Sequence, residues 1–85
     1  PQLHISYLNG DLSPQEVKAK NWNGIDYSWK VFQKNPQWIK EAKELGLLVN
    51  VWTVNEPKIM QKMIDLKVDY ITTDQPLILE KLLTK

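Results

Sequence analysis

Trp52 is the residue whose position points most clearly to a ligand, and Asn55 follows it three residues later. They belong to the stretch 47–55, which is mostly apolar and β-branched, follows Gly46 and ends just before Glu56-Pro57. Such a run is typical of a strand buried on both faces in a parallel sheet that helices cover. In folds of this kind, ligands bind at the carboxyl ends of the strands. The sequence therefore predicts that Trp52 shapes a pocket rather than transferring a proton.

The composition offers few residues that could bind a metal ion or a phosphate group. The chain has no Cys, which excludes disulfides and thiolate metal sites and leaves its redox compartment open. All eleven basic residues are Lys, so an oxyanion site would depend on Lys or on helix amino termini rather than on a bidentate Arg. Asp74 precedes Gln75-Pro76, and no second carboxylate is spaced to share a metal ion with it. We predict a cap or turn role for Asp74 and no metal site.

Length and charge narrow the class of protein further. Eighty-five residues form one domain at most, spanning 1–85, and a formal net charge of +1 does not indicate a nucleic-acid partner or a membrane surface bound by bulk charge. No apolar run approaches the ~18 residues that span a bilayer, and the amino terminus is not of the signal type. Because the chain begins abruptly at Pro1-Gln2-Leu3, we expect it to be cut from something longer. Its localisation stays open.

The expected secondary structure alternates along the chain. Strands are predicted over residues 3–8, 25–29, 47–55 and 68–73, and helices over about 14–20, 36–45, 57–66 and 77–83, with a loop over 30–35. Ser13, Pro14 and Glu16 form a capping-box start for the first helix. Asn35 and Asn55 precede later Pro residues, and each is predicted to cap a helix rather than to reach into a pocket.

A unit of one capped helix followed by one strand occurs three times in the sequence. A shift of 21 residues sets the segment 36–55 over 57–76, and a shift of 22 sets 14–27 over 36–49. Helix followed by strand at this period implies parallel strands joined by right-handed crossovers.

Four such strands in one regular series favour half of a closed barrel over an open sheet. No glycine-rich nucleotide loop follows any predicted strand, and no long connection allows helices to cover a second face. Helices on one face alone would leave the other face in water, which is rare for parallel sheets. We therefore predict an α/β fold, a parallel four-stranded half of a TIM (β/α)8 barrel. The missing barrel half or self-association would complete it.

Two segments closely resemble the glycerophosphodiester phosphodiesterase family. They are Val-Asn-Val-Trp-Thr-Val-Asn at 49–55 and Val-Asp-Tyr-Ile-Thr-Thr-Asp-Gln-Pro at 68–76. Residues 24–27, 36–39 and 44–47 resemble the family's sixth strand and the helix after it. Each motif is weak alone, but their order and spacing form a strong signal over nearly the whole chain. The resemblance implies that this segment is strands five to eight, the carboxy-terminal half of the barrel.

The activity implied by this resemblance is that of a whole enzyme. The family hydrolyses glycerophosphodiesters to an alcohol and glycerol 3-phosphate with a divalent metal, calcium or magnesium. Its His-Arg-Gly motif, second His and metal-binding carboxylates lie on the first four strands, which are absent here. His4 is the only His, whereas two-histidine acid–base catalysis needs a pair, and His4 would lie at the amino-terminal face of the barrel. We expect no catalytic residue and no bound metal in this segment.

The resemblance assigns three aromatic residues to the substrate pocket. Trp52 would form a wall that packs on the glycerol carbons, the alternative being core filling. Tyr27 and Trp29 lie near the end of the second predicted strand, where the family has an aromatic lining. Pocket lining and plain core are equally open for these two residues.

Three polar residues are expected to have structural roles. Asn50 shares a strand face with Trp52, and a hydrogen bond inside the barrel is favoured for it over ligand contact. Asp26 and Asp69 occupy equivalent early positions in two repeats. We expect both to act at the closed end of the barrel, by capping or by pairing with Lys.

The sequence thus predicts a phosphodiesterase segment that supplies pocket wall but no catalytic group, and the isolated chain is expected to be inactive. The alternative is a non-catalytic half-barrel module that acts by self-association or complementation. A flavodoxin-like binding module is disfavoured, because the chain has no glycine-rich loop.

Overall fold

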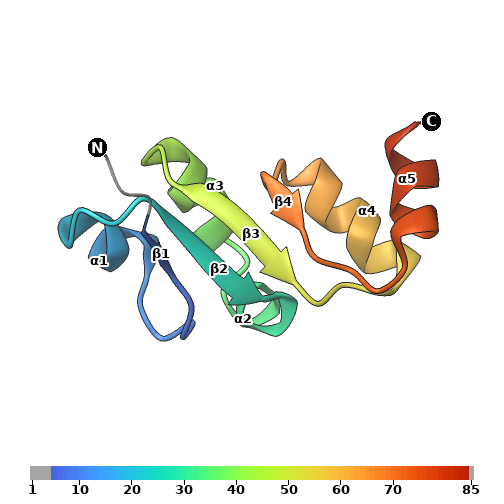
Figure 1. Cartoon of the computed structure of the whole chain (residues 1–85). Helices are drawn as coiled ribbons and strands as arrows, with labels where there is room; N and C mark the ends of the chain where they lie inside the picture. The colour runs from blue at the N-terminus through green and yellow to red at the C-terminus, as the bar shows by residue number, and fades with distance from the viewer. Residues whose placement is uncertain (1–4, 85) are drawn as a thin grey trace.

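The structure, a computed structural model, describes residues 5–84, in which strands and helices alternate (Figure 1). The strands are β1 (Ser6–Tyr7), β2 (Gly24–Ser28), β3 (Leu48–Trp52) and β4 (Tyr70–Ile71). The helices are α1 (Pro14–Ala19), α2 (Trp29–Lys34), α3 (Trp38–Glu44), α4 (Pro57–Asp65) and α5 (Pro76–Leu83). The predicted position of His4 lies outside the described residues.

All four strands lie in one parallel sheet, in the order β1-β2-β3-β4. The centre of the sheet is the β2–β3 ladder, which runs from Gly24 opposite Leu48 to Ser28 opposite Trp52. β1 and β4 add two residue pairs each. Parallel neighbours joined through helices confirm the predicted fold, a parallel four-stranded half of a TIM barrel.

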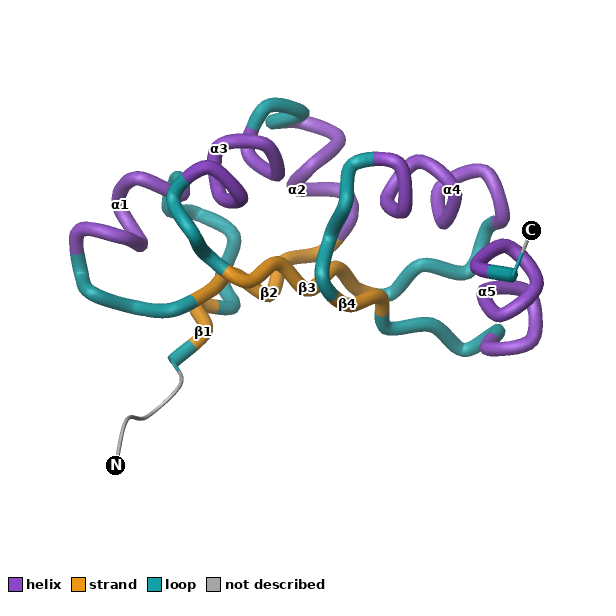
Figure 2. Tube along the Cα trace, turned by 90° about the horizontal axis from the view of Figure 1, so that it is seen from above, coloured by secondary structure: helices purple, strands orange, loops and turns teal. Residues whose placement is uncertain are grey.

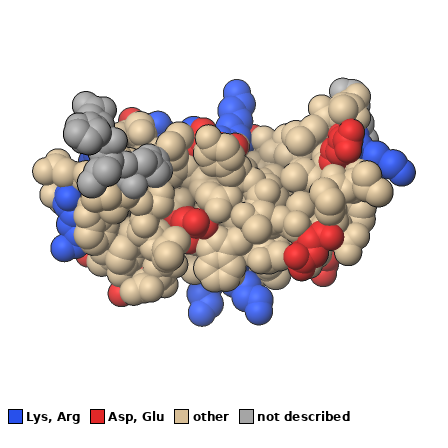
Figure 3. Space-filling view, viewed as in Figure 1, with Lys and Arg blue, Asp and Glu red and all other residues tan. Residues whose placement is uncertain are grey.

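The helices cover only one face of this sheet. Helices α1 to α4 lie together on that face, and α5 lies beyond the β4 edge (Figure 2). The opposite side, here called the open face, is formed by alternate strand residues and carries no helix among residues 5–84. Its exposed apolar residues include Leu48 and Trp52, each 38% exposed, and Tyr70, 63% exposed. Figure 3 shows this face, with charged side chains mainly along its margins.

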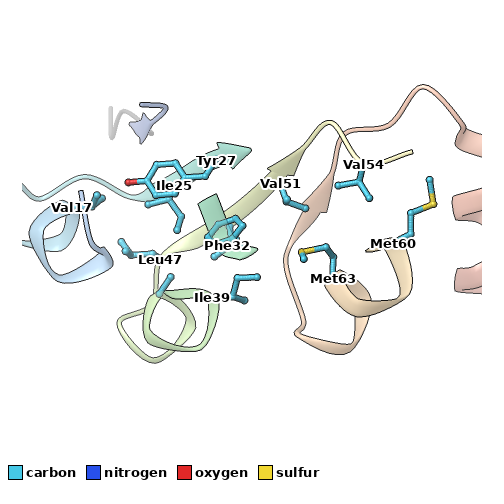
Figure 4. Packing of buried hydrophobic residues seen from close by; sticks show 12 residues of the cluster. Val17, Ile25, Tyr27, Phe32, Ile39, Leu47, Val51, Val54, Met60 and Met63 are labelled. Atoms are coloured by element: carbon cyan, nitrogen blue, oxygen red, sulfur yellow. The ribbon is translucent and has the colours of Figure 1, made fainter. Parts of the chain in front are cut away.

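The hydrophobic core fills the space between the sheet and the helices (Figure 4). Strand residues that alternate with those of the open face meet apolar residues from the helices. The buried set is Val17, Ile25, Tyr27, Phe32, Ile39, Ala42, Leu47, Val49, Val51, Val54, Met60 and Met63. This one-sided core accounts for the strand periodicity of β2 and β3.

The start of α1 confirms its predicted capping box. Ser13 Oγ accepts a hydrogen bond from the Glu16 amide at 3.3 Å, and Glu16 Oε1 accepts one from the Ser13 amide at 2.9 Å. Two amide groups at the helix start are thereby satisfied. Gly46 follows α3 with φ +77°, in the left-handed region that ends many helices.

The predicted loop over 30–35 is wrong, because this segment lies largely in helix α2. Ser28 caps it by accepting a hydrogen bond from the Lys30 amide at 3.3 Å, and Phe32 anchors it in the core. Asn35 caps the end of α2 rather than the start of the next helix, and its Nδ2 donates to the Val31 carbonyl at 3.1 Å. The cap and the buried Phe32 ring hold this six-residue helix together with Trp29 and Val31, which pack partly buried against the core.

Candidate functional site

The carboxyl ends of the parallel strands meet at one rim of the sheet, where the segments after β3 and β4 lie side by side. The Thr72 amide donates to the Val51 carbonyl, and the Val54 amide donates to the Thr72 carbonyl, each at 2.9 Å. Trp52 and Ser28 are the last residues of β3 and β2 and stand opposite each other. This rim is the position at which α/β barrels build their sites.

Trp52 lies on the open face at this rim, outside the hydrophobic core. Its indole Nε1 donates to the Asp26 carbonyl at 2.8 Å, so the ring has a fixed anchor on β2. The side chain nevertheless remains partly exposed. An anchored, accessible aromatic ring is suited to a pocket wall, and its contact with substrate stays a prediction.

Tyr27 lies on the opposite side of the sheet from Trp52 and is completely buried. Its hydroxyl donates to the Leu12 carbonyl at 2.8 Å, and its ring centroid lies 5.8 Å from that of Phe32 and 6.2 Å from that of Trp38. Burial, followed by nearby negative charge, raises the pKa of this hydroxyl far above its ordinary value. The structure therefore gives Tyr27 a packing role and leaves no surface of it for a ligand.

Trp29 is the first residue of α2 rather than part of a strand. Its ring packs against the core and lines a small apolar hollow with Phe32, Ile59 and Met63. The Lys30 ammonium lies 6.0 Å from its ring centroid. Because these neighbours belong to α2 and α4, Trp29 is on the helix side, and the structure does not bring it together with Trp52 on the open face.

A line of polar side chains crosses the open face. Asn50 Nδ2 donates to Asp26 Oδ1 at 2.8 Å and to Thr72 Oγ1 at 3.4 Å. The hydrogen bond predicted for Asn50 on this side of the sheet is therefore confirmed. The role predicted for Asp26 is wrong: it stands in the middle of β2 and bonds an amide, with no Lys paired to it among the described residues. The partnership of Asp26 with Asn50 was not found by sequence reasoning.

Asn55 connects the two loops at the rim. Its Oδ1 accepts hydrogen bonds from the Asp74 amide at 2.9 Å and from Thr73 Oγ1 at 3.2 Å, and its Nδ2 lies 3.4 Å from Asp74 Oδ2. The helix cap predicted for Asn55 is wrong, because α4 is preceded by Glu56 at the cap position and the Asn55 side chain is used by the neighbouring loop. Asp74 lies in the turn before α5, as predicted.

Asp69 binds Lys43 at the opposite, amino-terminal end of the sheet. Lys43 Nζ lies 2.7 and 2.8 Å from the two carboxylate oxygens, and the Val49 amide donates to the same carboxylate at 2.8 Å. Burial raises the pKa of Asp69, but the hydrogen bonds from Lys43 and Val49 outweigh it, so the pKa is lowered overall. The pairing with Lys predicted for Asp69 is confirmed.

The described residues do not fit a divalent metal ion. Within residues 5–84, no three His, Asp or Glu side chains come together as potential ligands. The two carboxylates on the open face and at the rim, those of Asp26 and Asp74, are bonded to Asn side chains. The same part of the chain contains no helix of the length and apolarity needed to cross a membrane.

Comparison with known proteins agrees with the half-barrel fold and identifies the family. The model of the glycerophosphoryl diester phosphodiesterase family matches residues 10–78. The crystal structure of a glycerophosphodiester phosphodiesterase from Parabacteroides distasonis ATCC 8503 is 51% identical, with a TM-score of 0.93, over 99% of this chain and 35% of that one. That of a putative glycerophosphoryl diester phosphodiesterase from Silicibacter pomeroyi DSS-3 is 31% identical, with a TM-score of 0.79, over 96% of this chain and 31% of that one.

The chain thus spans roughly a third of the length of each of these two structures. Among curated proteins, no sequence matches it. The family model covers well over half of the chain, and the Parabacteroides structure matches it almost from end to end. This chain belongs to the glycerophosphoryl diester phosphodiesterase family.

Proposed function

We propose that this chain is the pocket-wall segment of a metal-dependent phosphodiesterase that hydrolyses glycerophosphodiesters to an alcohol and glycerol 3-phosphate. The remainder of the barrel supplies the proton-transfer groups and the metal ligands. The observation that carries this proposal is the position of Trp52, anchored and partly exposed on the open face at the carboxyl rim of a family member.

The chemistry of an indole suits this role. Its flat apolar face packs against carbon-bound hydrogens of a glycerol unit, while a substrate phosphate needs cationic partners that the ring does not provide. The described carboxylates of the open face are bonded to amides, and no metal-ligand cluster forms within residues 5–84. We therefore assign part of the substrate pocket to this segment and bond cleavage to the remainder of the barrel.

A chimeric enzyme tests the proposal directly. This chain would replace the matching third of the Parabacteroides distasonis enzyme, and release of glycerol 3-phosphate from glycerophosphocholine would be measured with calcium or magnesium. We expect turnover by the chimera, and we expect Trp52→Ala to lower kcat/KM at least about tenfold, equivalent to about 1.4 kcal/mol of transition-state binding.

Trp22→Ala is the matched control. Trp22 stacks on Tyr7 with ring centroids 5.2 Å apart, so this substitution removes an indole at a site away from Trp52. It should lower the melting temperature without a comparable change in KM. If Trp52→Ala instead lowers the melting temperature and leaves both kinetic constants unchanged, Trp52 is a packing residue and the proposal fails.

A second candidate function, a non-catalytic module that associates with itself or with a partner half, is favoured by the exposed apolar open face. The two functions separate in one assay. Hydrolysis of glycerophosphocholine by the isolated chain with added metal would exclude the non-catalytic module. Turnover that appears only on mixing the chain with the other two thirds of the Parabacteroides enzyme would support the hypothesis that the chain is a segment of an enzyme.

A further inference from the structure

The indole of Trp52 leans back over the sheet rather than projecting beyond its rim. Ser28 stands opposite Trp52 in the β2–β3 ladder, yet the indole Nε1 donates to Asp26, two residues closer to the amino end of β2. Because Asp26 itself pairs with Asn50, the ring must cross to β2 at the level of Asn50. The direction of the ring is therefore set by the position of the Asp26 carbonyl.

The uneven edge of the sheet makes this carbonyl accessible to the indole. β1 pairs with β2 only at Gly24 and Ile25, so Asp26 lies one residue beyond that pairing. Backbone carbonyls inside a protein require hydrogen-bond partners, and the indole N–H supplies one here. The short β1 strand and the position of Trp52 are thus linked through one atom of Asp26.

The Asp26 side chain is held in turn by Asn50. Its Oδ1 accepts from Asn50 Nδ2 at 2.8 Å, and the same Nδ2 lies 3.4 Å from Thr72 Oγ1. A carboxylate only accepts hydrogen bonds, so the amide must present its NH2 group to Asp26. Among the residues that the structure describes, the other polar atom of this amide, Asn50 Oδ1, is buried and has no hydrogen-bond partner. Buried polar atoms without partners are uncommon in native structures, and this one adjoins the support of Trp52.

We propose that Asp26 and Asn50 are positioning residues for Trp52: Asn50 fixes Asp26 to β3, and the Asp26 carbonyl fixes the plane of the indole that faces the substrate. This proposal rests on the proposed function, because the orientation of the ring matters for activity only if Trp52 is a pocket wall. It gives a role to the contact between these two polar residues at the centre of the open face.

The first test is a double-mutant cycle in the chimeric enzyme. Asn50→Leu removes the amide at nearly constant volume, and Trp52→Phe removes the indole N–H while keeping an aromatic ring. We expect each variant to raise KM about tenfold with a smaller change in kcat, and the double variant to resemble the single ones, as coupled neighbours do. If the two effects multiply, Asn50 does not act through Trp52 and the proposal is overturned.

The second test needs no activity and uses the full 85-residue chain. With ¹⁵N-labelled Trp, the four indole N–H groups give separate signals, and the signal of Trp52 is the one lost in Trp52→Phe. Asn50→Leu and Asp26→Ala should speed exchange of this proton with water at least about tenfold, since its hydrogen bond is weakened. Asp26→Asn keeps an oxygen that can accept from Asn50, and it should restore slow exchange.

The indole signals of Trp22, Trp29 and Trp38 are internal controls and should keep their exchange rates. An unchanged Trp52 exchange rate in both disrupting variants overturns the positioning role, whatever the chimera does. If the chimera is inactive while the Trp52 proton responds as expected, the proposed function fails and the positioning of Trp52 stands. The two conclusions are therefore separable.

Discussion

The Asp74 amide donates a hydrogen bond to Asn55 Oδ1 at 2.9 Å, and this contact joins the loop after β3 to the loop after β4. Thr73 donates to the same oxygen from the neighbouring position, at 3.2 Å. One amide side chain therefore holds two consecutive loops together at the carboxyl rim, three residues after Trp52. Loops at this rim form the pockets of α/β barrels, so Asn55 fixes the shape of the rim.

Replacing Asn55 should destabilise this rim without disturbing the core. Asn55→Ala leaves the Asp74 amide and Thr73 hydroxyl without their acceptor, so we expect a loss of about 1 kcal/mol, or a melting temperature lower by about 4–8 °C. Circular dichroism during heating measures this change. Lys58→Ala, at an exposed position of α4, is the control and should leave the melting temperature within about 2 °C. Equal effects of the two variants would contradict the joining role of Asn55.

The four strands of the sheet could be predicted from the sequence because each signal was local and repeated. Ser13 with Glu16 marked a helix start, Gly46 marked a helix end, and apolar strands recurred at a constant spacing. Helix α2 was not predicted, because six residues are too few to show a helical periodicity of apolar residues. Its determinants include one cap, Ser28, and one buried ring, Phe32.

The candidate site could be predicted only in part, because it depends on the stagger between strands. The sequence repeat sets Asp26 over Leu48, whereas the sheet pairs Leu48 with Gly24 and Asp26 with Asn50. This two-residue offset is a property of strand stagger in a curved parallel sheet, which no single strand encodes. The burial of Tyr27 had a signal, however: it shares its strand face with the core residue Ile25.

Acid should weaken the fold through Asp69. The folded-state pKa of this carboxyl is lowered, because the hydrogen bonds from Lys43 and Val49 outweigh the effect of burial. A lowered pKa contributes stability that is fully present above the unfolded value, about 3.9, and is lost as the pH falls through the folded value. Urea unfolding measured at pH 7 and at successive steps below about pH 4 should show this loss.

Two substitutions isolate the contribution of the ion pair. Asp69→Asn keeps an oxygen for the Val49 amide but cannot titrate, and Lys43→Met removes the cation while Asp69 keeps its bond to Val49. Both variants should be less stable than the native chain at pH 7, and Asp69→Asn should show a shallower decline in acid. A decline as steep as that of the native chain in Asp69→Asn would show that other carboxyls cause it.

Gly24 and Gly46 should both resist substitution, but for different reasons: lack of space at Gly24 and backbone conformation at Gly46. A Cβ on Gly24 would lie 2.7 Å from the Leu48 carbonyl oxygen and 3.1 Å from Ser6 Oγ, so Gly24→Ala should cost about 1–3 kcal/mol by overpacking. Gly46 has open space around it but a φ of +77°, which Asn adopts more readily than Ala. Gly46→Asn should therefore be milder than Gly46→Ala, and Gly24→Asn worse than Gly24→Ala. The same order at both sites in thermal unfolding would refute this distinction.

The open face should make the isolated chain associate. Leu48, Trp52 and Tyr70 expose apolar surface there, and within residues 5–84 β1 and β4 are each paired along one edge only. Sedimentation of the chain at micromolar concentration should show a dimer or a larger species, and Tyr70→Lys should shift it toward monomer, because burying an ammonium group against apolar surface is unfavourable. Gln33→Lys adds the same charge at an exposed position of α2 and should leave the association unchanged. A native chain that sediments as a folded monomer would mean that the open face tolerates water, and self-association would then have no part in its function.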